Sequence, residues 1–91
     1  MSFVLKFKPP GFTLAKYHET IKLLSEAGVG DPTGRSYHVC SGDHNGVEIT
    51  DVWDNMEEFQ AFGETLVPIM HSLGVDPGQP GITEVHNIII G

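Results

Sequence analysis

The sequence predicts an α+β fold in which two helices cover one face of a four-stranded antiparallel sheet. Three observations predict it: four segments have the pattern of strands, two segments repeat apolar residues at helical spacing, and proline- and glycine-rich stretches separate them. At 91 residues the chain has the length of one domain, so we expect a single domain over residues 1–91.

The first strand is predicted over residues 2–8, where apolar residues alternate with more polar ones. Pro9 and the residues after it end this strand, since proline cannot donate to a ladder. Thr13 can cap a helix, and the apolar spacing that follows predicts that this helix stops at Gly28.

Two further strands, predicted over residues 35–41 and 47–53, form a hairpin with Asn45-Gly46 as the turn-forming pair. The second helix then opens at Asn55, which forms a capping-box pattern with Glu58.

The second helix contains a proline, Pro68, after Gly63. Proline removes a helical donor and clashes with the preceding turn, which predicts a kink or two short helices near residues 63–67. Residues 74–81 are rich in proline and glycine and are predicted to form a loop.

The C-terminal run from Glu84 to Ile90 is predicted to be the last strand because it is rich in β-branched residues. His86 and Asn87 are adjacent in it and point to opposite faces, so at least one of them is expected to face a protected space. A buried imidazole needs a partner and changes charge near neutral pH, which makes His86 the leading candidate for a general base.

The resulting order of strand, helix, strand, strand, helix, strand is the ferredoxin-like pattern. Its open sheet face must be covered, and the chain is 40% hydrophobic although it is small. We therefore expect a homodimer in which a second copy completes the core.

The charge and cysteine content exclude several classes of partner. The formal net charge is -7 and no basic stripe is present, so neither nucleic acid nor an anionic membrane is an expected partner. One cysteine, no signal-peptide pattern and no membrane-spanning stretch together predict a soluble, cytoplasmic protein.

Strand alternation divides the candidate residues between the two sheet faces. The helix side is predicted to receive Phe3, Leu5, Phe7, Tyr37, Val39, Val47, Ile49 and Trp53. The opposite side is predicted to receive Lys6, His38, Cys40, Glu48 and Thr50.

The face to which His86 belongs stays open. On the side away from the helices it would join a polar cluster of Lys6, His38 and Glu48 that fixes dimer register. On the helix side it would enter a pocket, where Asp51 could fix its tautomer and His18 or Tyr37 could orient or polarise a substrate oxygen. The pocket itself is predicted to include Tyr17, His38, Trp53, Phe59, Phe62 and His71.

Several of these residues have simpler structural roles. Tyr17 suits the core, His71 suits the dipole at a helix end, and Cys40 suits an inert small apolar residue. His38 and Cys40 share a strand face, but no four-ligand zinc spacing follows, so no metal site is predicted.

Some motifs of the chain resemble those of a known superfamily. They are Gly11-Phe12-Thr13, Asp51-Val52-Trp53 with Phe59 and Phe62, the segment 62–68, and Glu84-Val85-His86-Asn87. In these the chain is similar to small members of the dimeric α/β-barrel superfamily, which includes the antibiotic-biosynthesis-monooxygenase-like proteins. The resemblance implies a barrel shared by two sheets, ligands between sheet and helices, and chemistry that ranges from cofactor-free oxygenases to cyclases, isomerases and haem-degrading enzymes.

The spacing of Trp53, Phe59 and His71 is also similar to that of the haem-degrading members, which would make His71 a haem ligand. The first strand has no counterpart of the asparagine that those enzymes carry there, and Gly63 and Pro68 interrupt the helix that leads to His71. Haem is therefore a minor alternative to the expectation of no cofactor.

Three functions follow from these patterns. The leading one is a metal-free oxygenase, cyclase or isomerase that transfers protons through a histidine on an apolar or aromatic molecule. The others are a non-catalytic module that binds a small molecule or only dimerises, and a haem-binding monooxygenase. The sequence does not name the substrate or the reaction.

Overall fold

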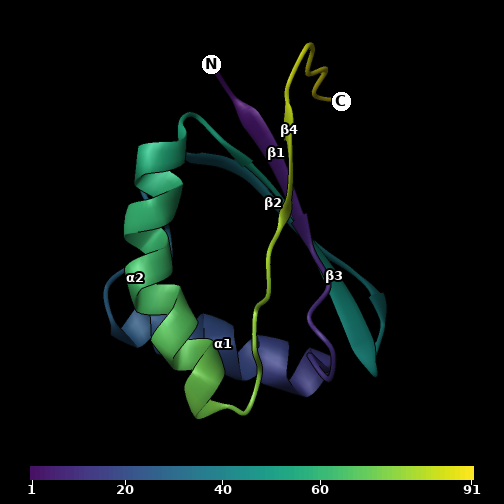
Figure 1. Ribbon diagram of the computed structural model, residues 1–91, viewed down its shortest axis with the longest axis vertical. Coiled ribbons are helices and arrows are strands. Elements are labelled where there is room, and N and C mark those ends of the chain that lie inside the picture. Colours follow the sequence, from purple (N-terminus) through teal and green to yellow (C-terminus); the bar gives the residue numbers. More distant parts are fainter.

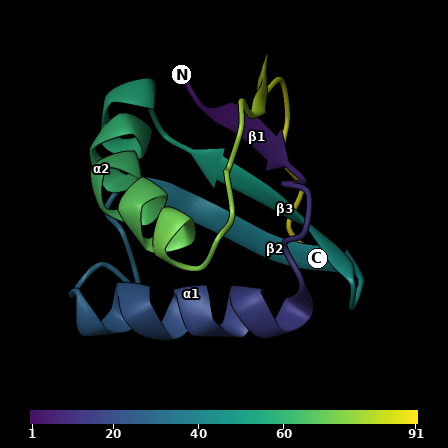
Figure 2. The same cartoon turned by 60° about the horizontal axis from the view of Figure 1, so that its bottom comes forward.

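The computed structural model describes all 91 residues. The elements in chain order are β1 (Phe3–Phe7), α1 (Leu14–Glu26), β2 (Arg35–Asp43), β3 (Gly46–Trp53), α2 (Met56–Ser72) and β4 (Gly81–Glu84). The strands form one antiparallel sheet in the order β2-β3-β1-β4, and both helices lie on one side of it (Figures 1 and 2). The predicted α+β class and ferredoxin-like order are confirmed.

Local signals place the helix ends as the sequence predicts. The Thr13 side chain accepts a hydrogen bond from the Lys16 amide at 3.2 Å, and that of Asn55 accepts one from the Glu58 amide at 2.9 Å. After α1, Gly28 adopts a positive φ of 80°, and the Val29 amide donates back to the Leu24 carbonyl. Glycine takes this conformation at little cost, which explains why the helix ends there.

Two predicted details of the connections are wrong. The hairpin turn between β2 and β3 consists of His44 and Asn45, one residue earlier than predicted, because Asp43 still pairs with Gly46. The helix α2 continues through Gly63 and Pro68, so of the two predicted alternatives, a kink or two short helices, the second does not occur.

The core lies between the sheet and the helices. Leu5 of β1 and Trp53 of β3 are fully buried there. The remaining buried members are Phe12, Leu24, Val47, Ile49, Phe62, Leu66, Met70 and Val75. Burial of this apolar surface is the main force that holds the two layers together.

The predicted long C-terminal strand is wrong. β4 ends at Glu84, and only the Val85 amide, which donates to the Ser2 carbonyl, extends the pairing. Residues 87–91 turn across the side of the sheet that carries Val4, Tyr37 and Val52, and line a hollow with them. The β-branched run favours a strand locally, but β1 begins at Phe3, which already pairs with Glu84, so the residues after Glu84 have no strand to pair with.

Candidate active site

An irregularity in β2 decides which side chains face the helices. Arg35 pairs with Trp53 and Tyr37 pairs with Val52, so Ser36 is one extra residue in the strand. Such a bulge moves every later side chain to the opposite face. His38 and Cys40 therefore face the helices, and Tyr37 and Val39 do not, which corrects the predicted division of this strand.

The bulge brings His38 into a chain of hydrogen bonds between sheet and helix. Its Nε2 lies 2.7 Å from the Tyr17 hydroxyl on α1, and its Nδ1 lies 2.6 Å from Oδ1 of Asp51 on β3. The rings of Tyr17 and His38 are also nearly parallel, with an interplanar angle of 10°. Three elements thus fix the imidazole from two directions.

Asp51 determines where the imidazole carries its proton. A carboxylate only accepts hydrogen bonds, so Nδ1 of His38 donates to Asp51, and Nε2 of the neutral ring accepts from the Tyr17 hydroxyl. The other carboxylate oxygen accepts from the Trp53 indole at 3.3 Å. Asp51 is only 3% exposed, and both of its oxygens are partnered, as burial of a charge requires.

The phenol and the nearby thiol both hold their protons more tightly than usual. Burial, together with the neighbouring Cys40, raises the pKa of Tyr17 above its ordinary 10.0, while the positive charge of Arg35 acts in the opposite direction. Burial likewise raises the pKa of Cys40 above 9.0, which is the reverse of what a nucleophilic thiol needs. Tyr17 therefore acts as a neutral hydroxyl, and Cys40 as a small apolar residue.

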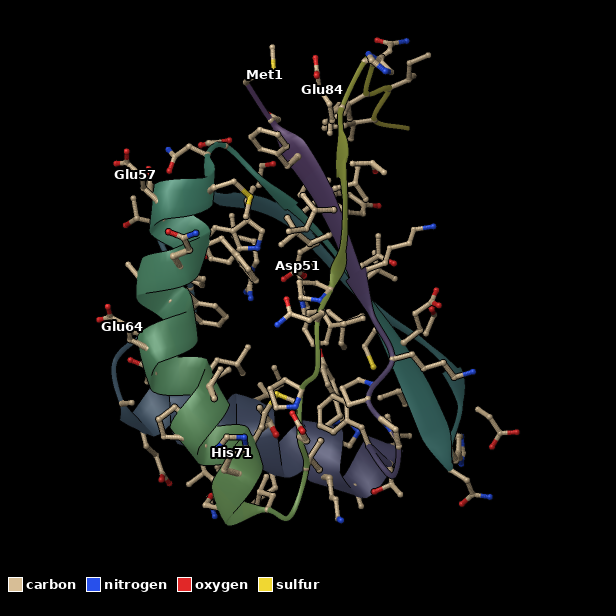
Figure 3. The ribbon with its side chains drawn as sticks, viewed as in Figure 1. Met1, Asp51, Glu57, Glu64, His71 and Glu84 are labelled. Carbon is tan, nitrogen blue, oxygen red and sulfur yellow. The ribbon has the colours of Figure 1, made fainter.

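The hydrogen-bonded chain forms one wall of an apolar cavity between the sheet and the helices. Its free space is about 20 Å³, which is close to that of one water molecule. The lining residues are Phe7, Phe12, Tyr17, Thr20, Ile21, Leu24, Arg35, His38, Ile49, Asp51, Phe62, Leu66 and Met70. In Figure 3, Asp51 lies in this interior layer between the sheet and α2.

A second hollow of about 160 Å³ adjoins the cavity. It lies between α2 and the segment 77–80, with Phe59 and Gly63 in its wall. Phe7 and Leu66 line both spaces, so these two side chains form the partition between them. A space of this size admits one aromatic ring.

The structure gathers some of the predicted site residues and disperses others. Tyr17, His38, Asp51 and Phe62 line the cavity, Phe59 lines the second hollow, and Trp53 contacts Phe62 and Asp51. Asp51 does contact an imidazole, but that of His38 and not that of His86. The remaining four residues, His18, Tyr37, His71 and His86, are outside the cavity wall.

Each of these four is exposed for a specific reason. His86 lies beyond the end of β4, so the predicted protected space for it is wrong. Tyr37 is 51% exposed on the other side of the sheet, because the bulge precedes it. His18 is exposed at the N-terminal half of α1, where it contacts the Tyr17 ring from outside.

The fourth, His71, is exposed in the last turn of α2 (Figure 3). Its imidazole is not part of the cavity wall, so the residues do not fit a haem that His71 would ligate there. No group of three or more histidine, cysteine, aspartate or glutamate side chains is placed to hold a metal ion.

Arg35 was not among the predicted site residues, although it lines the cavity. Its position follows from its pairing with Trp53, which puts both side chains on the helix side, and the bulge then brings His38, three residues later, to the same side. The sequence signal that could have indicated it is composition: Arg35 is the only arginine among five basic residues.

Comparison with known proteins supports the fold. No family model and no curated protein sequence matches the chain. Among solved structures, the monooxygenase ActVA-Orf6 of Streptomyces coelicolor, in complex with nanaomycin D, matches with a TM-score of 0.62 and 16% identity over 99% of this chain and 92% of the other. SnoaB, a cofactor-independent oxygenase from Streptomyces nogalater, matches with a TM-score of 0.60 and 17% identity over 97% and 94%.

A candidate antibiotic biosynthesis monooxygenase from Deinococcus radiodurans matches with a TM-score of 0.62 and 15% identity over 99% of this chain and 97% of the other. This chain has the fold of the antibiotic-biosynthesis-monooxygenase-like proteins. The resemblance drawn from the sequence is thereby confirmed at the level of the fold. In addition, neither helix is long and apolar enough to cross a membrane.

Proposed function

We propose that this chain is an enzyme that moves a proton on a small apolar or aromatic molecule, with His38 as the acid–base group. The observation that carries the proposal is the Tyr17–His38–Asp51 chain of hydrogen bonds in the wall of an apolar cavity. It takes the place of the sequence-based hypothesis in which His86 is the base.

The proposed proton path uses each group of the chain in turn. An acidic C–H or O–H group of the substrate gives its proton to the Tyr17 oxygen while the Tyr17 proton passes to Nε2 of His38. Asp51 stabilises the imidazolium that forms and holds it in position. Because the pKa of Tyr17 is raised, a phenolate is disfavoured there, and the simultaneous transfer of both protons avoids it.

A carbanion or phenolate formed in this way is the intermediate that an oxygenase without a cofactor, a cyclase and an isomerase all need. Such chemistry requires no metal, and the description of SnoaB as cofactor-independent supports it. The nanaomycin D complex of ActVA-Orf6 supports a polycyclic aromatic substrate class. For a molecule of that size, Phe7 and Leu66 must rotate to join the two hollows.

The test is oxygen uptake with anthrone, whose CH₂ group is weakly acidic. The expected reaction consumes one O₂ per anthrone and gives anthraquinone and one water. Replacement of the base by His38→Gln is expected to lower the rate by about 10²–10⁴, while His86→Gln, the matched control, leaves it unchanged. A rate that is equal in His38→Gln and wild type contradicts the proposal.

A non-catalytic ligand-binding module is the second candidate, and the mostly apolar wall of the cavity favours it. It predicts that anthrone and nanaomycin D bind, as seen by calorimetry, while neither oxygen uptake nor exchange of the anthrone CH₂ protons with D₂O is accelerated. Exchange that depends on His38 without oxygen uptake would instead support a cyclase or isomerase.

We also propose that two copies associate through the side of the sheet that the helices leave open. Ile89 and Ile90 are each 83% exposed beside it, and an apolar surface of this kind marks an interaction site. Ile89→Asp combined with Ile90→Asp is expected to convert the dimer to a monomer in light scattering, while Lys22→Asp on α1 does not. A monomeric wild-type protein contradicts this proposal.

The single cysteine supports a reducing compartment, for which we propose the cytoplasm.

A further inference from the structure

Arg35 is the only lysine or arginine in the wall of the cavity, which also contains His38. The other basic residues of this acidic protein are the four lysines, and none of them lines it. A positive charge in a mostly apolar wall favours ligands that carry a negative charge, because screening by mobile ions is weaker there than in open solvent.

The guanidinium has few partners within the protein. Its Nη2 donates to the Gly30 carbonyl at 3.4 Å, and its central carbon lies 5.8 Å from the centroid of the Phe62 ring. No carboxylate lies within 4.0 Å of it, since the one ion pair of the structure joins His38 and Asp51. Most of its five N–H donors are therefore free to bind an acceptor.

One carboxylate near Gly34 belongs to Glu58, whose Oε2 is buried without a hydrogen-bond partner. It is nevertheless not paired with Arg35, because its side chain lies against Gly34 and bonds to the Asn55 amide group. Neither Glu58 nor Asp51, whose oxygens bond to His38 and Trp53, forms an ion pair with Arg35.

We propose that the ligand of this cavity carries a carboxylate on an aromatic ring system, with the carboxylate paired to Arg35 and the rings against Phe62. A guanidinium binds a planar carboxylate through two parallel hydrogen bonds, and it also stacks on aromatic faces. This inference rests on the proposed function for its site, and it names the substrate class. It also places the ring system in the cavity that Tyr17 lines together with Arg35 and Phe62.

The test compares 2-naphthoate with 2-naphthamide, which has the same rings and no charge. Calorimetry with wild-type protein is expected to give a dissociation constant about tenfold lower for the acid. In Arg35→Gln the two compounds are expected to bind equally. In Arg35→Lys part of the preference for the acid remains. In Lys22→Gln, the matched control on the exposed surface of α1, the whole preference for the acid remains. Thermal melts confirm that each variant is folded.

Equal binding of acid and amide by the wild-type protein overturns the inference, and so does failure of the acid to bind at about 1 mM. A preference that persists in Arg35→Gln overturns it as well. His38→Gln separates the two proposals, because it is expected to keep the preference for the acid while it loses anthrone oxidation. If anthrone oxidation depends on His38 but the protein shows no preference for the acid, only the role of Arg35 is rejected and the proposed function stands.

Discussion

The two faces of the sheet come from the same strands but differ in whether their polar groups are hydrogen-bonded within the protein or exposed. On the helix side, the buried Asp51 has both oxygens hydrogen-bonded, and His38 has a partner on each ring nitrogen. On the other side, Tyr37 is half-exposed and Ile89 and Ile90 lie open beside it. A face that is closed in one chain must satisfy its polar groups internally, whereas an open face leaves that to water or a partner.

The largest expected difference between the faces concerns stability. Leu5→Ala removes a fully buried side chain and is expected to lower the free energy of unfolding by about 2–5 kcal/mol. Ile89→Ala, in the exposed tail, is expected to change the free energy of unfolding of the monomer by less than about 0.5 kcal/mol. Urea unfolding below the association concentration measures both. If Ile89→Ala lowers the free energy of unfolding as much as Leu5→Ala does, the tail is part of the monomer core.

The next effect concerns the polar network of the closed face. In Asp51→Asn, the amide oxygen can accept from only one of His38 and Trp53, so His38 must change tautomer or one donor stays unpaired, and we expect a cost of about 1–3 kcal/mol. The Trp53 emission spectrum and urea unfolding check this. Asp54→Asn, three residues away and exposed, is the control and should leave both unchanged.

Alkaline pH should destabilise the closed face. Tyr17 has a raised pKa in the folded protein, so the unfolded chain loses this proton first as pH increases. The stability that Tyr17 contributes is therefore complete below pH 10.0 and is lost as pH increases through the higher folded value. Melting temperatures from pH 8 to 11 should fall less steeply in Tyr17→Phe. Cys40→Ser should remove the loss of stability that the raised pKa of the thiol causes, which begins near pH 9.0. Identical pH profiles for wild type and Tyr17→Phe would contradict this assignment.

The smallest effect tests whether empty space in the helix layer is kept for a ligand. A Cβ at Gly63 meets nothing within 4 Å, so Gly63→Ala should stabilise α2 by about 0.5–1 kcal/mol. The same methyl group narrows the second hollow and should weaken binding of nanaomycin D. A more stable variant with unchanged binding would mean that ligands do not use this hollow.

The sequence by itself determined the order of the elements and most of their limits. Caps at Thr13 and Asn55, the stop at Gly28 and the alternation in β1 are local preferences, and local chemistry is sufficient to predict them. The same applies to Asp51 as the carboxylate beside an imidazole, although the sequence suggested the wrong histidine.

Only the tertiary structure decided which histidine this is. The extra residue at Ser36 has no signal in the sequence, yet it moves His38 inward to the side of Arg35 and turns Tyr37 outward. His86 lies outside the cavity wall for a similar reason. A strand needs a neighbour as well as β-branched residues, and the pairing of β4 with β1 ends at Glu84, before His86. Both decisions depend on strand pairing, and pairing is a property of two segments that lie far apart in the chain.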